Sequence, residues 1–439
     1  MTGQKDIVST VQDFIEKDRD FVINLTRDMV RVPSVNPKFE LGDGLNREGD
    51  VQALLEPILQ QEGFATEQFD ALPGRPNLIG DKPGSEERSL ILCGHIDVVP
   101  TGSLKDWTVD PFGGEIRDGR LYGRGSIDMK GGVAACVAAM RALNRCGVTL
   151  DGRLAFHSVV DEEAGGGGAI ANVKAGRLAN SILVAEPSWG DVLPAEGGLE
   201  WARVTIRGRN GHSAFRYNEI YPQPDEPGRL VPAVNAIEIA ARFIEAVRQF
   251  EGDITRASSH PLLPAGMNTI NIGVMWGGTG LGPNGVPTVM TNPAIIPDVA
   301  VLDLDMKFLP HQNSAEYRRA FEAFVDHFCQ MDAWLRENPI SIAWELGGLH
   351  FPPMNTAPDH PLVASLMRRK AEIGKAPAMK GFIAVCDAAH YAGAGVDGVI
   401  FGPSGDGFHS TDEYVDIASL VESAKVIAAS VIDFCGVKA

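Results

Sequence analysis

The sequence predicts an α/β protein of two domains, with the second domain inserted into the first. The chain of 439 residues is longer than one hydrophobic core usually organises. In residues 1–195 and 351–439, short apolar runs alternate with helical periodicity, which is typical of a mostly parallel central sheet flanked by helices. Residues 196–350 instead follow the order strand, helix, strand, strand, helix, strand, which indicates a ferredoxin-like α+β domain.

The first domain is expected to begin with two helices. Residues 7–30 carry apolar side chains at helical spacing, Pro33 ends that pattern, and a second helix is expected at about 50–62. Further along, apolar runs predict buried strands, and helical periodicity predicts the helices that alternate with them. The expected strands are 90–96, 152–160, 181–187 and 397–403, and the expected further helices are 132–147, 361–373 and 416–434.

The inserted domain is predicted from four apolar, alternating segments and two long amphipathic ones. Its expected strands are 199–208, 268–276, 299–308 and 340–346, and its expected helices are about 231–250 and 314–336.

Composition excludes several classes of function. The chain has 39 Lys and Arg against 57 Asp and Glu, a net charge of −18, so nucleic acid and anionic membranes are not expected partners. Its N-terminus lacks the apolar core of a signal peptide, and no apolar stretch reaches the roughly 20 residues of a membrane span. The six cysteines show no paired spacing, which predicts reduced thiols in a cytoplasmic protein, without a disulfide framework or a cysteine-based zinc site.

The stretch "LILCGHIDVVP" places two ionisable residues at the end of a predicted buried strand. Side chains alternate between the faces of a strand, so His95 and Asp97 are expected on one side and Ile96 on the other. This arrangement favours a functional pair at the strand end.

Other acids and a second histidine follow predicted strands or precede predicted helices. They are Asp128, Glu162, Glu163, Glu186 and His409. Functional groups in an α/β sheet gather at the carboxyl ends of the strands, and this residue set suits a pair of zinc, cobalt or manganese ions that share a carboxylate. Taken singly, each residue could instead cap a helix or hydrogen-bond a loop. Three consecutive acids behind a buried strand, 161–163, are costly without a cation or solvent. The four glycines that follow predict a tight turn beside the site, because a phosphate loop would need Gly-Lys-Ser/Thr after them.

Five motifs, in this order, resemble the co-catalytic zinc metallopeptidase and amidohydrolase family of acetylornithine deacetylase, succinyl-diaminopimelate desuccinylase, aminoacylase and glutamate carboxypeptidase. The motifs are "GHIDVVP", "GRGSIDMKGG", "DEEAGGGG", "AEPS" and "FHSTDEYV". The resemblance implies a zinc aminopeptidase-like catalytic domain, and it makes the insert a lid and dimerisation domain. A homodimer acting on a small-molecule substrate is therefore expected.

The resemblance also implies a ligand set for two divalent ions per chain, with zinc the expected metal and cobalt or manganese the alternatives. Asp128 would bridge the two ions. His95 and Glu186 would complete one site, and Glu163 and His409 the other.

Three further residues receive roles from the same resemblance. Asp97 would orient His95 from behind the metal, as a carboxylate commonly does. Glu162 would be the general base that takes a proton from the attacking water and returns it to the leaving amine. His212, in the motif "RGRNGHSAF" of the insert, would reach the substrate carbonyl across the dimer; on sequence alone, a surface histidine in a turn is equally expected.

Two positions depart from the family pattern. Many members carry an Arg that clamps a substrate carboxylate where this chain has Lys307, and Lys lacks the bidentate fork. Cys386 stands where a hydroxyl residue is common. The predicted function is a metal-dependent amidohydrolase, deacetylase-like or desuccinylase-like, acting on a small N-acyl amino acid or related compound. The alternatives are a dipeptidase or carboxypeptidase, and a deaminase or carbamoyl hydrolase; a metal-stabilised binding protein would not need Glu162.

Overall fold

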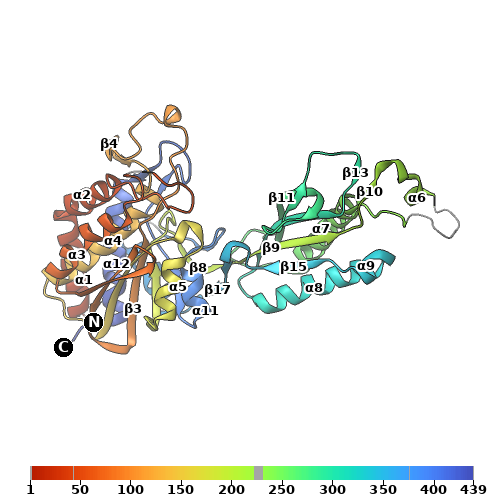
Figure 1. The fold of residues 1–439 in the computed structure, drawn as a ribbon. Coiled ribbons are helices and arrows are strands. Elements are labelled where there is room, and N and C mark those ends of the chain that lie inside the picture. The colour runs from red at the N-terminus through yellow and green to blue at the C-terminus, as the bar shows by residue number, and fades with distance from the viewer. Residues whose placement is uncertain (1, 43, 222–230, 375, 439) are drawn as a thin grey trace. The chain divides into compact units, whose positions relative to one another are not determined.

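Figure 1 shows the computed structural model of the chain, which describes residues 2–42, 44–221, 231–374 and 376–438. Contacts within the chain define two compact units. The first unit is Met1–Glu196 with Met354–Ala439, and the inserted unit is Gly197–Pro353. Each unit has its own buried apolar cluster.

A nine-stranded sheet forms the centre of the first unit. Its strands follow the order β1-β2-β6-β3-β7-β19-β8-β17, and β18 also pairs with β8. Their bounds are β1 Ala65–Leu72, β2 Arg75–Lys82, β3 Ser85–His95, β6 Gly152–Val159, β7 Ser181–Val184, β8 Val192–Glu196, β17 Met354–Asn355, β18 Met379–Phe382 and β19 Asp397–Ile400. The four neighbours β6, β3, β7 and β19 are parallel, so their carboxyl ends lie at one edge of the sheet.

The predicted α/β fold is confirmed, and the sheet is mixed. The strands at its margins run antiparallel to their neighbours: β1 with β2, β2 with β6, β8 with β19 and β17 with β8. The parallel centre is the part that the buried apolar runs predicted.

Helices cover the faces of this sheet (Figure 1). They are α1 Thr2–Lys17, α2 Arg19–Val30, α3 Glu48–Gln61, α4 Gly131–Arg145, α5 Gly167–Lys174, α10 Pro361–Glu372, α11 Ala388–Gly393 and α12 Ile417–Cys435. Helix α4 contacts α1, α2, α12 and β3, and most of its side chains are buried. Its second residue, Gly132, lies so close to the end of β7 that a Cβ there would be 1.9 Å from the Ala185 carbonyl oxygen.

The single helix predicted for residues 7–30 is wrong, because the chain breaks at Asp18 between α1 and α2. Asp18 leaves helical geometry, and its carboxylate accepts a hydrogen bond from Arg141 Nε at 2.8 Å. A side-chain partner on another helix thus competes with continued helix formation at an Asp, a weak helix former.

A small four-stranded sheet, absent from the sequence prediction, joins two distant segments of the first unit. It pairs β4 Glu115–Arg117 with β5 Arg120–Tyr122, then β21 Tyr414–Asp416 and β20 Gly405–Asp406. This pairing brings the residues before Asp128 next to the segment that carries His409.

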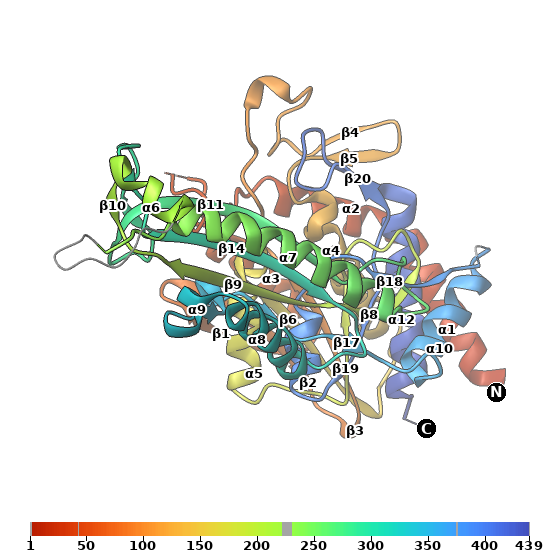
Figure 2. The same ribbon diagram turned by 90° about the vertical axis from the view of Figure 1, so that its right-hand side faces the viewer.

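The inserted unit has the predicted ferredoxin-like topology. Its chain order is β9 Gly198–Arg207, α7 Ala236–Ala257, β11 Thr269–Leu281, β14 Val299–Phe308, α8 Ser314–Gln330 and β15 Ser341–Trp344. The sheet order is β11-β14-β9-β15, with every neighbouring pair antiparallel. Figure 2 shows α7 and α8 lying along these strands, and side chains such as Phe243 and Phe321 pack on the alternate strand residues Ala202, Val204 and Ile206.

Two helix predictions in the insert had wrong limits. Helix α7 begins at Ala236, after Asn235 caps it through Ile237 N and Glu238 N, five residues later than expected. The segment predicted as one helix, 314–336, is α8 followed by α9 Ala333–Glu337, because Asp332 accepts hydrogen bonds from Trp334 N and Leu335 N and starts a new helix.

All six cysteines lie in the described part of the chain and are free thiols. Among the described residues, no helix has both the length and the apolar character needed to cross a membrane.

Candidate active site

Three strands of the first unit deliver ionisable side chains to one edge of the sheet, and two loops add an acid and a histidine. His95 is the last residue of β3, the turn Glu162–Ala164 follows β6, and Glu186 follows β7. Asp128 lies in the turn before α4, and His409 lies between β20 and β21. Because β3, β6 and β7 are parallel neighbours, side chains from separate parts of the sequence meet here, as the sequence predicted.

Asp128 stands between the two histidines. Its Oδ1 atom is 3.2 Å from His95 Nε2, and its Oδ2 atom is 3.3 Å from His409 Nε2. Each oxygen of one carboxylate therefore faces a different imidazole, which is the arrangement of a bridging ligand.

A glutamate accompanies each histidine. Glu186 Oε1 is 3.4 Å from His95 Nε2, and Glu163 Oε2 is 3.0 Å from His409 Nε2. We call His95, Glu186 and Asp128 Oδ1 the buried half-site, and His409, Glu163 and Asp128 Oδ2 the open half-site. Candidate ligand atoms of His95, Glu162 and Glu186 lie within 4.8 Å of one another, as do those of His95, Asp128 and Glu163.

The electrostatics of this cluster call for positive charge. Burial raises the pKa of Glu162 well above its ordinary value, and it raises the pKa of Glu163 to about 7. Hydrogen bonds to Asp128 and Glu163 raise the pKa of His409 to about 10, so the acids hold a proton on that ring. Divalent cations would supply the same compensation, and the nitrogen and oxygen donors present suit them.

The tautomer of His95 also fits a metal ligand. Its Nδ1 atom is 2.9 Å from the backbone carbonyl oxygen of Asp97, which can only accept a hydrogen bond. Nδ1 therefore carries the proton in the neutral ring, and the Nε2 lone pair faces Asp128 and Glu186.

The role predicted for the Asp97 carboxylate needs correction. It is 3.8 Å from His95 Nδ1, too far for a hydrogen bond, and the backbone carbonyl of Asp97 orients the ring instead. The carboxylate accepts hydrogen bonds from Glu162 N at 3.1 Å, Glu163 N at 3.3 Å and Asn36 Nδ2 at 2.8 Å. Asp97 thus holds the turn that presents the two glutamates.

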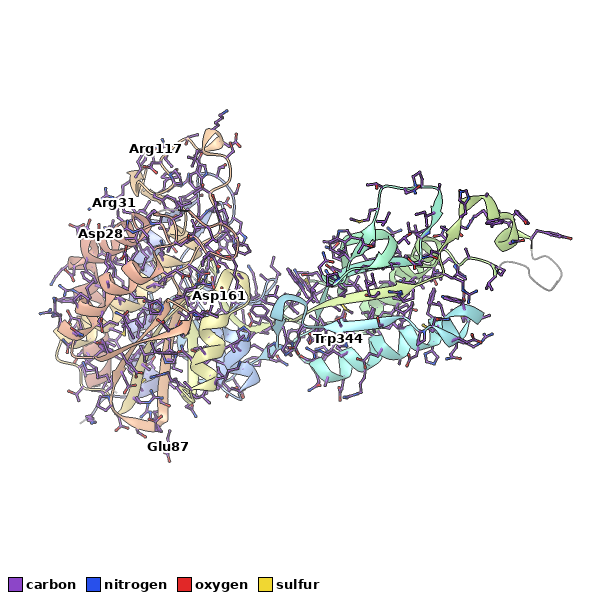
Figure 3. All side chains as sticks on the ribbon, viewed as in Figure 1. Asp28, Arg31, Glu87, Arg117, Asp161 and Trp344 are labelled. Atoms are coloured by element: carbon purple, nitrogen blue, oxygen red, sulfur yellow. The ribbon has the colours of Figure 1, made fainter. Side chains whose placement is uncertain are left out.

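Asp161, the first of the three consecutive acids and labelled in Figure 3, is paired with cations that belong to neither half-site. It is fully buried and accepts hydrogen bonds from Lys38 Nζ at 2.6 Å, Arg75 Nη1 at 2.7 Å and Asn36 Nδ2 at 3.1 Å. Arg75 also donates twice to Glu48. Two cations therefore compensate Asp161, and only Glu162 and Glu163 are left for the site. The triple acid was visible in the sequence, but its cationic partners were not.

Glu413, four residues after His409, was also missed. Its carboxylate accepts hydrogen bonds from Arg124 Nη1 at 2.6 Å and from the backbone N–H groups of Gly125, Ile127 and Asp128 at 3.0, 3.1 and 3.2 Å. One buried side chain thus ties the main chain of Asp128 to the segment that carries His409. An acid inside the motif "FHSTDEYV" was the available signal.

The predicted tight turn after the acids is present. Gly166 has φ +69°, and a Cβ there would lie 2.1 Å from His390 Nε2. A Cβ on Gly168 would lie 2.3 Å from the Val160 carbonyl oxygen. Glycine is required because the turn folds directly onto its own strand and onto α11.

Of three other positions singled out in the sequence, two belong to the inserted unit and one to the first unit. His212 is an exposed residue of the inserted unit, and its Nδ1 accepts a hydrogen bond from Ala214 N at 3.0 Å. Lys307 is on β14, opposite Leu199 and Thr269. Cys386 is buried and donates its thiol to Glu196 Oε2 at 3.3 Å, and burial raises the pKa of both groups.

Comparisons with known proteins show the family to which the chain belongs. The model of the peptidase family M20/M25/M40 matches residues 91–433. N-formyl-4-amino-5-aminomethyl-2-methylpyrimidine deformylases from Halalkalibacterium halodurans and Bacillus subtilis are 28% and 29% identical, each covering 98% of both chains. A succinyl-diaminopimelate desuccinylase from Rhodospirillum centenum is 38% identical over 49% of this chain and 56% of its own.

Solved structures share the fold. Aminopeptidase PepT from Bacillus cereus matches with a TM-score of 0.70 and 21% identity, covering 95% of this chain and 98% of its own. The family model covers well over half of the sequence and includes every residue of both half-sites. The chain therefore belongs to peptidase family M20/M25/M40 and is a hydrolase of amide bonds, as the sequence motifs predicted.

Proposed function

We propose that this protein is a dinuclear metal-dependent hydrolase that removes a small acyl group, a formyl group above all, from the nitrogen of an amine. The observation that carries the proposal is the placement of Asp128, whose two oxygens face two different histidine and glutamate pairs. A site for a single ion has no use for this duplicated donor set.

The buried half-site would hold one divalent ion and the open half-site the other. Zinc suits the mixture of imidazole and carboxylate donors best, with cobalt and manganese next. Bound ions of this kind lower the pKa of a water molecule and polarise a carbonyl group.

Glu162 is the group that moves the proton. Its Oε2 atom is 3.8 Å from His95 Nε2, beside the ligand atoms, and its backbone N–H is fixed by Asp97. Burial raises its pKa, so its carboxylate accepts a proton more readily than an exposed glutamate does. It takes a proton from water as the water oxygen bonds to the acyl carbon. It then delivers that proton to the amine nitrogen as the carbon–nitrogen bond breaks, which leaves a carboxylic acid and a free amine.

The nature of the acyl group is supported by the relatives that match over nearly the whole chain, which are named as deformylases. Lys307 adds a second support, because its ammonium cannot make the bidentate contact with a substrate carboxylate that an Arg would make. Both observations are consistent with a substrate that carries a small acyl group on an amine and needs no carboxylate for recognition.

A homodimer through the inserted unit, with His212 acting in the partner's site, is part of the same proposal. Exposed His212 and the exposed apolar residues Val274 and Met275 on β11 support it. Mixing inactive Glu162→Gln chains with inactive His212→Ala chains should restore activity in the heterodimer, and heterodimers without any recovery would exclude the shared site. The cytoplasmic location stays a prediction.

A substrate panel tests the function. The protein, stripped and reloaded with zinc, cobalt or manganese, is assayed against N-formyl, N-acetyl and N-succinyl amines, N-carbamoyl amino acids and dipeptides. We expect hydrolysis that requires metal and is fastest for a formyl compound. Metal-loaded protein that prefers dipeptides or N-carbamoyl compounds would replace this proposal with the peptidase or carbamoyl hydrolase alternative.

A further inference from the structure

Two aromatic side chains lie on the loops that carry Glu186 and His409. Trp189 is three residues after Glu186, and Phe408 immediately precedes His409. Their rings are in contact, with centroids 5.3 Å apart and an interplanar angle of 72°. Consecutive Cα atoms are about 3.8 Å apart, so this pair lies beside the ligand cluster, within a few residue lengths of both half-sites.

Hydrogen bonds fix the two loops to each other. Ser188 Oγ donates to the Gly402 carbonyl at 3.2 Å and accepts from Gly402 N at 3.0 Å. The indole Nε1 of Trp189 donates to the Gly405 carbonyl at 3.2 Å. The indole is thus held in one orientation by its polar edge, although 56% of Trp189 is exposed.

The backbone of Trp189 makes this residue an unexpected choice for its position. Asp191 N donates to the Ser188 carbonyl at 2.9 Å and closes a turn in which both central residues, Trp189 and Gly190, have positive φ, +54° and +74°. Asn, Asp and Gly favour the first of these positions, and a bulky aromatic residue there is strained.

The turn between β4 and β5, in the same unit, can be compared with the turn at Trp189. Its central residues, Asp118 and Gly119, have φ +52° and +76° and are the types that such a turn favours. At Trp189 the chain has closely similar φ values but carries a large ring that is 56% exposed, so burial does not compensate the strain. Strain of this kind is typical of residues retained for function.

We propose that Trp189, supported by Phe408, stacks against a planar ring in the amine part of the substrate. The substrate class is then an N-acylated arylmethylamine or heteroarylmethylamine. The inference rests on the proposed function for the acyl end, and it assigns recognition of the other end to an aromatic surface. Flat rings stack on an exposed indole face, whereas saturated rings of similar size cannot match its shape or its quadrupole.

Two substrates of nearly equal size test whether a planar ring is preferred over a saturated one. They are N-formylbenzylamine and N-formyl(cyclohexylmethyl)amine. We expect kcat/KM to favour the planar probe by about 5- to 100-fold, mostly through KM. Trp189→Asn removes the ring and suits the left-handed turn, so the protein should fold with an unchanged or higher Tm, and the preference should fall to about twofold or less. Asp118→Asn, the matched change in the other turn, should keep the preference of the unchanged protein.

Binding of the product amines gives a readout that does not depend on turnover. Calorimetry should show benzylamine binding at least about fivefold more tightly than cyclohexylmethylamine, and Trp189→Asn should abolish the difference. Equal binding of the two amines, or a Trp189→Asn protein that keeps the preference, would overturn the inference while leaving the hydrolase function intact. A marked loss of Tm in Trp189→Asn with equal losses on both probes would also overturn it, because the ring would then be structural. If neither probe is hydrolysed but benzylamine still binds selectively, the proposed acyl group is wrong and the aromatic surface stands.

Discussion

The two histidines of the site face the same carboxylate, but one lies at the end of a buried strand and the other in an exposed loop. The His95 side chain is 1% exposed, ends a central strand and has its Nδ1 bonded to the Asp97 carbonyl. The His409 side chain is 56% exposed, and its residue has φ +53° in a connection between two short strands. The buried half-site is therefore preorganised by the sheet, whereas the open half-site depends on a loop. We expect the buried half-site to bind its ion more tightly and the open one to exchange its ion first.

Removal of Asp128, the ligand that the half-sites share, should have the largest effect on activity. It should also abolish the difference in metal affinity between the half-sites. Asp128→Ala deletes one donor from each half-site, so we expect kcat/KM to fall by about 10⁴-fold or more and both ions to be lost together. Metal analysis after dialysis, with activity measured in parallel, checks this. Asp118→Ala removes an acid from an exposed turn and should change neither quantity; loss of only one ion from Asp128→Ala would show that Asp128 does not bridge.

Separate substitution of the two histidines should show that the buried half-site binds its ion more tightly than the open one. His95→Ala should lower the affinity of the more tightly bound ion by about 10²- to 10³-fold and lower Tm, because it leaves buried Glu186 beside a cavity. His409→Ala should weaken only the other ion and leave Tm within about 2 °C. Competition with a chelator measures both affinities. Equal effects of the two substitutions would remove the distinction between a buried and an open half-site.

Glu413 ties the main chain of Asp128 to the segment that carries His409, and its substitution should lower activity to an intermediate extent. Glu413→Gln keeps the shape but replaces one acceptor oxygen by an amide donor that opposes the backbone N–H groups. We expect kcat to fall by about 10- to 100-fold, with weaker metal binding, because Asp128 loses its fixed position. Glu115→Gln, at an exposed acid of β4, is the control. A Glu413→Gln protein that loses stability but keeps full activity and metal content would limit Glu413 to a structural role.

The smallest expected effect is on the free energy of unfolding as pH changes. It arises from His157 on β6, the strand that pairs with β3 beside the buried half-site. Burial lowers the pKa of His157 on β6 to about 3, and its Nδ1 is 2.7 Å from Tyr391 Oη. The unfolded chain binds a proton at this residue below about pH 6.5 while the folded chain does not, so stability falls as pH falls from 6.5 towards 3. The contribution is about 2 kcal/mol at pH 5.

Denaturant unfolding of His157→Gln and of the unchanged protein at pH 7 and pH 5 checks this value. The variant should lose about 2 kcal/mol less between the two pH values. His327→Gln, at an exposed histidine of α8, should behave like the unchanged protein. An identical loss in all three proteins would contradict a neutral, buried His157.

The gathering of the half-site side chains could be predicted from sequence, because His95, Glu163 and Glu186 follow apolar strands and the ends of parallel strands meet at one edge of a sheet. Their roles as metal ligands stay a prediction. Glu413 and Asp161 lie in motifs that the sequence displays, but their roles could not be predicted, because their partners are backbone N–H groups or cations from distant segments, such as Arg75. The role of Asp97 was misassigned for a related reason. Alternation of side chains predicts its face but not which donor its carboxylate takes. The helix break at Asp18 likewise depends on Arg141 of another helix.

The central claim is that Glu162 is the base beside a two-ion site and that Glu163 is a ligand in it. The most direct measurement compares the turnover and metal content of Glu162→Gln and Glu163→Gln, two isosteric changes at adjacent residues. We predict that Glu162→Gln lowers kcat by about 10²- to 10⁴-fold, roughly 3 to 5 kcal/mol, with metal content unchanged, whereas Glu163→Gln loses metal. A fully metal-loaded Glu162→Gln protein with near-normal turnover would contradict the account.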